Sequence, residues 1–220
     1  MIKLSTASLS FALLIFLYSC KDEECHNVDY GKLAYDPVSL TYEKWDSVTT
    51  AIFIDSNGTE HRYELRVDVE YEEQPLYTDT CEGQLVYTSY SSPYFLHRYS
   101  ADNNTAIAYA QLIGYLDGDQ SLAKDHLVDI FKISIIDDNI PLEHLSRICI
   151  ITSDRGGAID QETYNAAQFI VRDSVVLLNK TFYNVYEQKE GTKKLYYSPD
   201  TGAVSFTDNS GTKLVLDRIE

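Results

Sequence analysis

The ten residues from Arg62 to Tyr71 alternate strictly between charged and apolar side chains. In an extended chain the apolar residues share one face: Tyr63, Leu65, Val67, Val69 and Tyr71. The charged residues share the other face: Arg62, Glu64, Arg66, Asp68 and Glu70. A helix would spread these charges around its circumference, whereas a strand keeps them all in water and buries the apolar face. The segment therefore predicts a β-strand with one side against a hydrophobic core.

The same two-residue period recurs along most of the chain. The further strands that it predicts are Val48–Ile54, Gln84–Tyr90, Pro93–Tyr99, Leu127–Ile136, Arg147–Thr152, Gln168–Arg172 and Ser174–Leu178. Val38, Leu40 and Tyr42 alternate in the same way ahead of Trp45, so an extended segment is expected there too. A chain with so many short periodic segments is typical of a β-rich domain.

Two segments add turn and boundary information. Asn57–Gly58 follows an apolar run and predicts a tight hairpin, because both residues accept a positive φ. Thr105–Leu116 is ambiguous, since Ala106, Ala108 and Ala110 alternate but β-branched residues are few. We favour a strand there, with a helix capped by Asp102 as the alternative.

Two short helices are expected among the strands, over Ser121–His126 after Asp119 and over Gln161–Ala167 after Asp160. The Asp160 carboxylate can accept a hydrogen bond from the free N–H groups of the first turn. No repeat or Pro-rich linker divides the chain, so one domain over residues 35–220 is expected, with a boundary near residue 140 as the alternative. The predicted fold is all-β, or β-rich α+β: an antiparallel meander forming a curved sheet or a sandwich with one or two short helices.

The beginning of the chain reads as a targeting segment. Lys3 precedes an apolar run from Ala7 to Tyr18, which as a helix would span about 18 Å, well short of a hydrocarbon core about 30 Å thick. Residues 1–19 are therefore expected to be a signal peptide and not a membrane-spanning helix. Leu17-Tyr18-Ser19-Cys20 resembles a bacterial lipobox, which implies that Cys20 is lipidated and becomes the first mature residue. A plain secretory signal is the alternative.

Two further stretches resemble a known group of proteins. Lys21-Asp22-Glu23-Glu24 is similar to the tract that directs Bacteroidetes lipoproteins to the outer face of the outer membrane. The alternative is a solvated charged tether, which we expect over residues 20–34. The C-terminal patterns TFxNVY, YYS and GxVxF, within Lys180–Tyr186, Lys194–Ser198 and Gly202–Phe206, resemble the closing hairpins of many Bacteroidetes surface lipoproteins of unknown function. The resemblance implies a closing β-meander and a lipid-anchored, surface-exposed location, and it implies no activity.

Charge excludes one class of partner. The chain holds 34 Asp and Glu against 18 Lys and Arg, a formal net charge of −16, and no basic stretch interrupts this excess. Nucleic acid is excluded as an expected partner, because binding phosphates requires a basic surface. An acidic domain is also repelled by an anionic leaflet, so the expected membrane partner is the outer-membrane lipid reached through the Cys20 anchor.

The other cysteines fit an oxidising compartment. After Cys20, three remain, an odd number that allows one disulfide: Cys25, Cys81 and Cys149. Cys149 lies in the apolar run Ile148–Ile151 and is expected to be a buried small residue. Cys25 and Cys81 lie in polar surroundings, and a bridge between them would contribute about 4 kcal/mol on the chain-entropy estimate. We expect that pair to form a disulfide.

Catalytic and metal-binding signatures are missing from the sequence. No HExxH, GxSxG, GxGxxG, CxxC or P-loop pattern occurs. An EF-hand counted from Asp117 would put Leu122 at its glycine position and Val128 at its bidentate carboxylate position, so the motif fails. His144 and Cys149 could pair only if the thiol were exposed, which its apolar setting disfavours. We therefore expect no cofactor, no metal and no enzyme activity.

Aromatic residues make the most suggestive cluster. Four tyrosines crowd thirteen residues of two expected strands: Tyr87, Tyr90, Tyr94 and Tyr99. The simpler interpretation is that they pack across neighbouring strands. The functional interpretation is a platform for a glycan or a peptide. The expected role is a non-catalytic binding module for a glycan, a peptide or an envelope protein. The alternative is a lipid carrier with a half-barrel cavity, and a hydrolase is a third reading.

Overall fold

The computed structural model describes residues 28–32, 34–81, 84–102, 105–114, 128–137, 146–155, 159–189 and 193–220. Within these residues there are two helices, α2 (Pro37–Leu40) and α3 (Gln161–Gln168). The strands are β1 (Val28–Lys32), β2 (Thr50–Ile54), β3 (Glu60–Cys81), β4 (Gln84–Ser100), β5 (Thr105–Gly114), β6 (Val128–Asp137), β7 (Ser146–Asp154), β8 (Phe169–Leu177), β9 (Lys180–Gln188), β10 (Leu195–Ser198), β11 (Gly202–Thr207) and β12 (Lys213–Ile219). The predicted β-rich, antiparallel fold class is confirmed.

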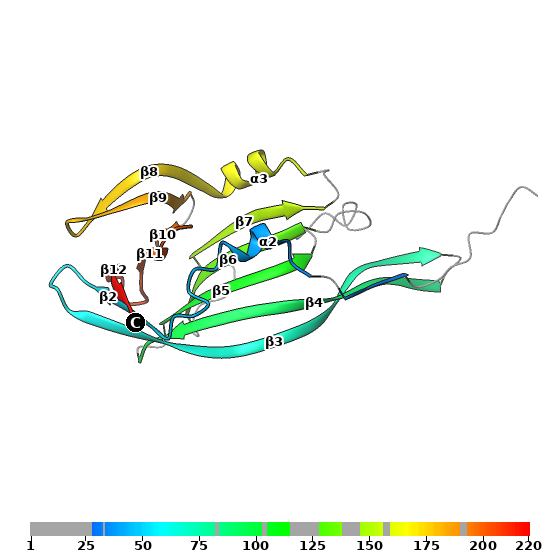
Figure 1. Cartoon of the computed structure of the whole chain (residues 1–220), viewed down its shortest axis with the longest axis horizontal. Helices are drawn as coiled ribbons and strands as arrows, with labels where there is room; N and C mark the ends of the chain where they lie inside the picture. The colour runs from blue at the N-terminus through cyan, green and yellow to red at the C-terminus, as the bar shows by residue number, and fades with distance from the viewer. Residues whose placement is uncertain are drawn as a thin grey trace, which may run out of the picture.

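All the strands in the described residues belong to one sheet (Figure 1). Its order is β7-β6-β5-β4-β3-β2-β12-β11-β10-β9-β8, with every neighbour antiparallel, and β1 adds a parallel pairing to β4. Neighbours along this order are consecutive in the chain except at one point, where β12 returns beside β2. This pairing joins the two ends of the meander, and the sheet is nearly closed.

The remaining gap lies between the end strands β7 and β8, which α3 connects. Asn165 of α3 closes it on the β7 side: its Oδ1 accepts a hydrogen bond from Ile151 N at 2.9 Å, and its Nδ2 donates to Ile151 O at 3.1 Å. One side-chain amide thus takes the place of a neighbouring strand. At the other end of β7, Ser146 Oγ donates to the carbonyl oxygen of Lys193 at 2.8 Å. The edge of β7 is therefore covered near both ends.

Strands β3 and β4 are longer than predicted. They pair from Glu64 and Ser100 to Cys81 and Gln84, so the ribbon extends beyond the rest of the sheet (Figure 1). Gln84–Tyr90 and Pro93–Tyr99, predicted as two strands, form the single strand β4. Thr105–Gly114 is a strand, as favoured over the helix. Within the expected tether, Val28–Lys32 form β1.

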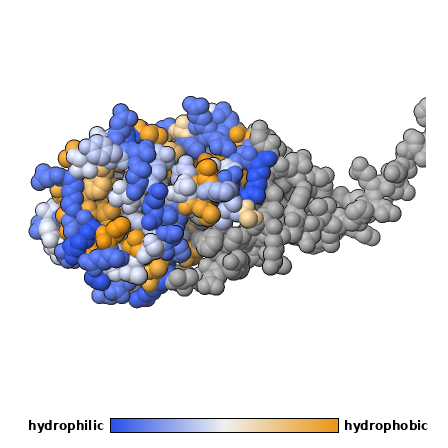
Figure 2. All heavy atoms as spheres, viewed as in Figure 1, coloured by the Kyte–Doolittle hydropathy of each residue, from blue (hydrophilic) through white to orange (hydrophobic). Residues whose placement is uncertain are grey.

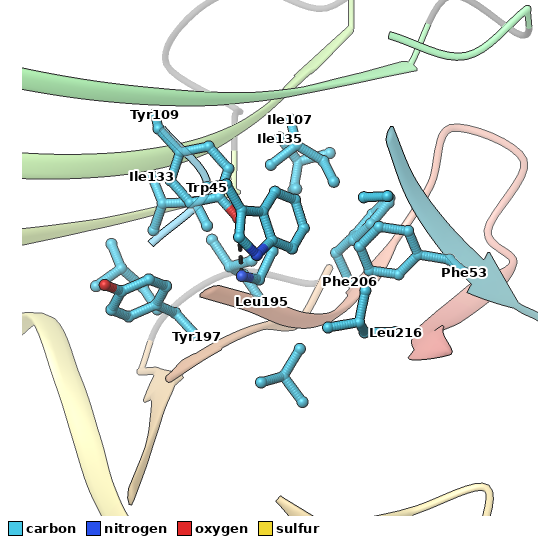
Figure 3. Packing of buried hydrophobic residues seen from close by; sticks show 14 of the residues in the cluster. Trp45, Phe53, Ile107, Tyr109, Ile133, Ile135, Leu195, Tyr197, Phe206 and Leu216 are labelled. Carbon is cyan, nitrogen blue, oxygen red and sulfur yellow. Dashed lines mark hydrogen bonds between the residues drawn. The ribbon is translucent and has the colours of Figure 1, made fainter. Parts of the chain in front are cut away.

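Trp45 is the centre of the core and is fully buried (Figure 3). Its ring centroid lies 5.1 Å from that of Tyr109, 5.2 Å from that of Tyr99 and 6.1 Å from that of Phe53. Its Nε1 donates to the carbonyl oxygen of Thr201 at 2.8 Å. Segment 41–49, which carries Trp45, has no regular strand partner, so around Trp45 loop residues and aromatic rings fill the space that the curved sheet encloses.

Buried tyrosine hydroxyls satisfy the carbonyl groups of this loop. Tyr99 Oη lies 2.5 Å from Trp45 O and 2.8 Å from Val48 O, and Tyr197 Oη donates to Tyr42 O at 2.5 Å. A buried loop needs such partners, because an unpaired carbonyl group in an apolar interior is costly. The tyrosines thus supply both the apolar area and the hydrogen bonds that let an irregular segment enter the core.

The extended segment expected at Val38, Leu40 and Tyr42 is wrong, since Pro37–Leu40 form the one-turn helix α2. Asp36 caps this helix by accepting a hydrogen bond from Val38 N at 3.0 Å, and Pro37 stands at its start. Val38 and Leu40 point into solvent, so their alternation does not reflect burial. Local capping chemistry decided the conformation here.

Strands β11 and β12 are buried on both faces. Leu214, Val215 and Leu216 are consecutive and all buried, although neighbouring side chains in a strand point to opposite sides. Figures 1 and 3 show the reason: β10–β12 lie between the β8–β9 hairpin and the β5–β7 strands. The hairpin forms an outer layer, with Leu177 and Phe182 buried as part of the core.

The hairpin expected at Asn57–Gly58 forms, with a different geometry. Only Gly58 has a positive φ, +79°, and Asp55 organises the turn by accepting hydrogen bonds from Asn57 N at 2.8 Å and Thr59 N at 2.9 Å. The β11–β12 turn repeats this design, with Asp208 accepting from Thr212 N at 2.9 Å. The predicted helix α3 is confirmed, with Asp160 as its cap. The helix predicted over Ser121–His126 lies outside the described residues.

Candidate functional site

Exposed apolar side chains concentrate on the β8–β9 hairpin. The structure describes eight large exposed apolar residues, and five of them belong to this hairpin: Ile170, Val171, Val176, Leu178 and Tyr183. Val176 and Tyr183 are 69% and 67% exposed. Figure 2 shows hydrophobic residues at the surface among hydrophilic neighbours at the end of the molecule where this hairpin turns. Scattered exposed apolar residues are ordinary, but a group of them marks an interaction surface.

The strand register explains which residues face outward. Val176 is opposite Thr181, and Ser174 is opposite Tyr183, so Val176 and Tyr183 lie on one face of the hairpin as diagonal neighbours. Phe182, opposite Val175, lies on the other face and is buried. The hairpin therefore has an anchored inner face and an apolar outer face.

The tip of the hairpin is strained. Leu178 and Asn179 have φ values of +48° and +63°, so the two-residue turn is of type I′, which favours Asn and Gly. A leucine with positive φ costs about 1–2 kcal/mol, because its Cβ crowds the following carbonyl group. Strained positions of this kind cluster at functional sites.

A depression of about 410 Å³ adjoins this tip. Three hairpin turns surround it, and its lining residues are Asp55, Ser56, Asn57, Val176, Leu177, Leu178, Gly211, Thr212 and Lys213. The β8–β9 side is apolar, and the other two sides carry hydroxyl, amide, ammonium and carboxylate groups. This combination fits a ligand that has both apolar area and hydrogen-bonding groups.

Two charges at the depression have defined settings. Hydrogen bonds hold the pKa of Asp55 below its ordinary value, first from Thr59 N and then from Asn57 N, and the His61 side chain, with Nε2 3.7 Å from Oδ2, acts in the same direction. Lys213 Nζ lies 5.6 Å from the centre of the Tyr196 ring. The rim therefore presents one fixed anion and one cation stacked on an aromatic ring.

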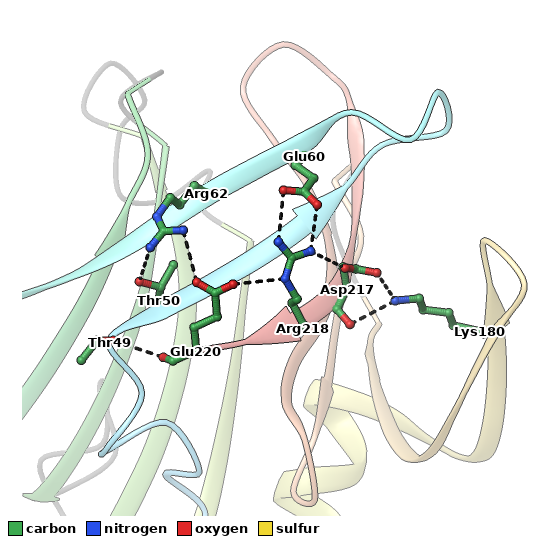
Figure 4. A network of polar contacts seen from close by, with 8 residues as sticks. All are labelled: Thr49, Thr50, Glu60, Arg62, Lys180, Asp217, Arg218 and Glu220. Carbon is green, nitrogen blue, oxygen red and sulfur yellow. Dashed lines mark hydrogen bonds and ion pairs between the residues drawn. The ribbon is translucent and has the colours of Figure 1, made fainter.

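A polar network fastens the hairpin to the sheet beside the depression (Figure 4). Lys180 Nζ donates to the carbonyl oxygen of Asp217 at 3.0 Å and also pairs with the Asp217 carboxylate. The side-chain bonds from Lys180 and, second, from Arg218 lower the pKa of Asp217. Arg218 joins Asp217 at 2.8 Å and Glu60 at 2.8 Å. Each exposed pair contributes little energy, and together they fix the orientation of the hairpin base.

Glu43 is an acidic group of the interior, outside this surface. Burial raises its pKa to about 8, although Trp45 N donates a hydrogen bond to its Oε1 at 2.9 Å. Its electrostatic neighbours include Tyr99, Tyr109 and Tyr197, whose pKa values burial also raises. Repulsion from the nearby Asp46 carboxylate adds to this rise in the pKa of Glu43.

Asp129 is a buried acid that holds the start of the domain in place. Its Oδ2 accepts from Asp36 N and from Ser39 Oγ, each at 2.7 Å, and its Oδ1 pairs with Arg155 at 3.1 Å. Its Oδ2 thus docks α2 on β6, and its Oδ1 holds Arg155. In the described part of the chain, no three His, Cys, Asp or Glu side chains are placed to hold a metal ion.

Tyr99 is not part of the expected exposed tyrosine platform. Its side chain is fully buried, and its hydroxyl group makes a hydrogen bond to the loop that carries Trp45. The side chains of Tyr87, Tyr90 and Tyr94 lie outside the described residues, as do Cys20, Cys25, His144 and the side chain of Cys81. Cys149, expected to be buried, is half-buried on β7 between the buried Ile148 and Ile150.

Sequence reasoning missed the β8–β9 surface, because Val175–Leu178 reads as an ordinary core-facing strand. The one sequence signal for it is Leu178-Asn179, because these two residues form a turn of the type that favours Asn-Gly.

Neither helix among the described residues is long and apolar enough to cross a bilayer. No protein family matches the chain, and no curated protein or solved structure matches it at a significant level.

Proposed function

We propose that this chain is a non-catalytic binding module that recognises its ligand on the outer face of the β8–β9 hairpin and in the adjoining depression. The observation that carries the proposal is the concentration on this hairpin of five of the eight large exposed apolar residues described, with Val176 and Tyr183 together on its outer face. A strained turn residue, Leu178, presents one of them at the tip. A nearly closed sheet suits this role, because it holds the hairpin on a rigid support.

Packing around Trp45 favours binding at the surface over carriage of a lipid. A carrier needs an enclosed apolar cavity of about 300–1,000 Å³. Here Trp45, Tyr99, Tyr109 and Phe206 fill the interior that the described strands enclose. The depression beside the hairpin is partly polar, and turn residues form its rim.

The chemistry of the surface favours a glycan or a peptide as ligand. Tyr183 offers an exposed ring, Val176 an aliphatic neighbour, and the turns Asp55–Asn57 and Gly211–Lys213 offer polar groups beside them. Tyrosine provides a large amphipathic contact area at low conformational cost.

Two surface variants test this proposal. The purified full-length chain is screened against a panel of oligosaccharides and an array of peptides, and each hit is measured again with the double variant Val176→Ser/Tyr183→Ser. We expect at least about tenfold weaker binding, corresponding to about 1.4 kcal/mol. Ile219→Ser is the matched control, because Ile219 is exposed on β12. Hits unaffected by the double variant, or an absence of hits, would contradict the proposal.

We also propose that a lipid on Cys20 anchors the module to the outer membrane, facing outward, as in Bacteroidetes surface lipoproteins. The lipobox-like Leu17–Cys20 supports this location. Two or three acyl chains would give a lasting attachment, whereas one chain gives only marginal binding. Radiolabelled palmitate is expected in the wild type and not in Cys20→Ala, and label in both would refute the anchor.

A further inference from the structure

We propose that the open edge of β8 receives an extended, basic polypeptide segment from another protein, which pairs with it as an additional strand. The inference rests on the proposed function, since β8 belongs to the same hairpin, and it names the class of ligand and the mode of binding. Strand addition of this kind draws its affinity from main-chain hydrogen bonds and its specificity from alternate side chains.

One edge of β8 has no strand partner in the described part of the chain. β8 is the last strand on the path of the sheet and pairs only with β9. Its nine residues span about 30 Å at about 3.3 Å per residue. Positions 170–174 and 176 are exposed, so solvent reaches most of its length.

The backbone edges of the two end strands of the sheet, β7 and β8, differ in what covers them. The backbone of β7 is occupied by the Asn165 amide at Ile151 and flanked by Ser146. Helix α3, which carries Asn165, ends where β8 begins and leaves the rest of β8 uncovered. The gap in the sheet is thus closed from one side only.

β8 also lacks the features that protect exposed edges in natural sheets. Such edges carry Pro, Lys, bulges or inward-pointing charges. The strand contains no Pro, Gly or Lys, and its pairing with β9 runs without a shift of register. Its one cation, Arg172, is engaged by Glu187, with Nε 2.7 Å from Oε2. The backbone edge is therefore regular, and the charges on it are Arg172, which is paired, and Asp173.

The charges along this edge select the partner. With Arg172 paired to Glu187, the exposed Asp173 of β8 and Glu162 of α3 remain, and neither makes an ion pair with a described residue. A segment with Lys or Arg alternating with apolar residues can place a cation beside Asp173 on one face and an apolar side chain beside Ile170 on the other, because residues 170 and 173 lie on opposite faces of β8. A second copy of this chain would bring another acidic surface with a net charge of −16, so a copy fits less well.

A defined peptide tests the inference. The probe is the nine-residue peptide Lys-Val-Lys-Val-Thr-Val-Lys-Val-Lys, and its control has the same sequence with alternate backbone nitrogens methylated. Methylation keeps the charge and removes the donors that a ladder needs. We expect the full-length chain to bind the probe at least about tenfold more tightly than the control. Asp173→Lys should weaken binding by about three- to tenfold, and Asp102→Lys, at a distant exposed turn, should leave it unchanged.

Each outcome has a definite meaning. Equal binding of the two peptides, or no binding, overturns strand addition, as does a dimer in sedimentation that Val175→Pro abolishes. Failure of the peptide, with oligosaccharide hits still lost in Val176→Ser/Tyr183→Ser, would refute only the strand inference. Hits that ignore that double variant would refute the proposed function, whatever the peptide does.

Discussion

Gly202 lies against the indole of Trp45 so closely that a Cβ on Gly202 would be 2.3 Å from Trp45 Nε1. The glycine follows a turn closed by a hydrogen bond from Thr201 N to Ser198 O at 3.2 Å, and its φ is +90°. Thr201 in turn accepts the hydrogen bond from the indole at 2.8 Å. The turn between β10 and β11 thus forms one wall of the tryptophan site.

Gly202→Ala is expected to lower the free energy of unfolding by more than about 3 kcal/mol. Positive φ costs an alanine about 1–2 kcal/mol, and the clash with Trp45 adds to that cost. Urea unfolding measures the change. Gly58→Ala is the matched control, because Gly58 has a φ of +79° and no atom within 4 Å of the added Cβ. Equal losses for the two variants would show that the contact with Trp45 is unimportant.

Glu43→Gln is expected to flatten the dependence of stability on pH. The pKa of Glu43 is about 8 in the folded chain against an ordinary 4.5, so the folded state holds the proton more tightly than the unfolded state. Its contribution is complete below about pH 4.5 and is lost as the pH rises through about 8. Unfolding free energies measured from about pH 5 to about pH 9 should fall less steeply in the variant. Glu64→Gln, at an exposed position, should keep the wild-type slope, and an unchanged slope in Glu43→Gln would contradict this account.

Leu178→Asn is expected to stabilise the protein by about 1 kcal/mol while weakening ligand binding, because asparagine accepts the positive φ of the turn and removes the apolar tip. Leu178→Ala is the control, since it removes the same side chain and leaves a positive φ on a residue that disfavours it. Thermal unfolding distinguishes the two. A similar gain in Leu178→Ala would mean that backbone strain is not the cause.

Asn165→Ala is expected to cost about 1–3 kcal/mol, because it leaves the N–H and C=O groups of Ile151 without their partner at the edge of β7. Amide hydrogen exchange at Ile151 should become faster. Glu162→Ala, on an exposed position of the same helix, should change neither quantity. Unchanged exchange at Ile151 in Asn165→Ala would show that another group protects this edge.

The strands could be predicted because their period of two follows directly from burial on one side. Arg62–Tyr71 shows this, since Tyr63 is fully buried and Arg62 and Glu64 are exposed. The same rule failed at Val38 and Leu40, where a capping carboxylate and a proline favoured one helical turn. Periodicity describes which faces of a strand differ, and it carries no information on capping or on strand order.

The candidate site could not be predicted for a related reason. Val176 and Leu177 are adjacent apolar residues, yet one is 69% exposed and the other is buried. Which of the two is buried depends on how the β8–β9 hairpin lies over β11 and β12, which is a long-range arrangement. Likewise, Tyr99 reads as a member of a surface cluster and becomes a core residue because a loop that carries Trp45 needs its hydroxyl.

Hydrogen–deuterium exchange with and without the ligand identified by the oligosaccharide and peptide screens tests the assignment of the binding surface most directly. The account predicts slower exchange across residues 169–183 of the β8–β9 hairpin and around the turns at 55–59 and 208–212. It predicts no change in the β5–β7 strands. Slower exchange confined to β5–β7, with the hairpin unaffected, would contradict it.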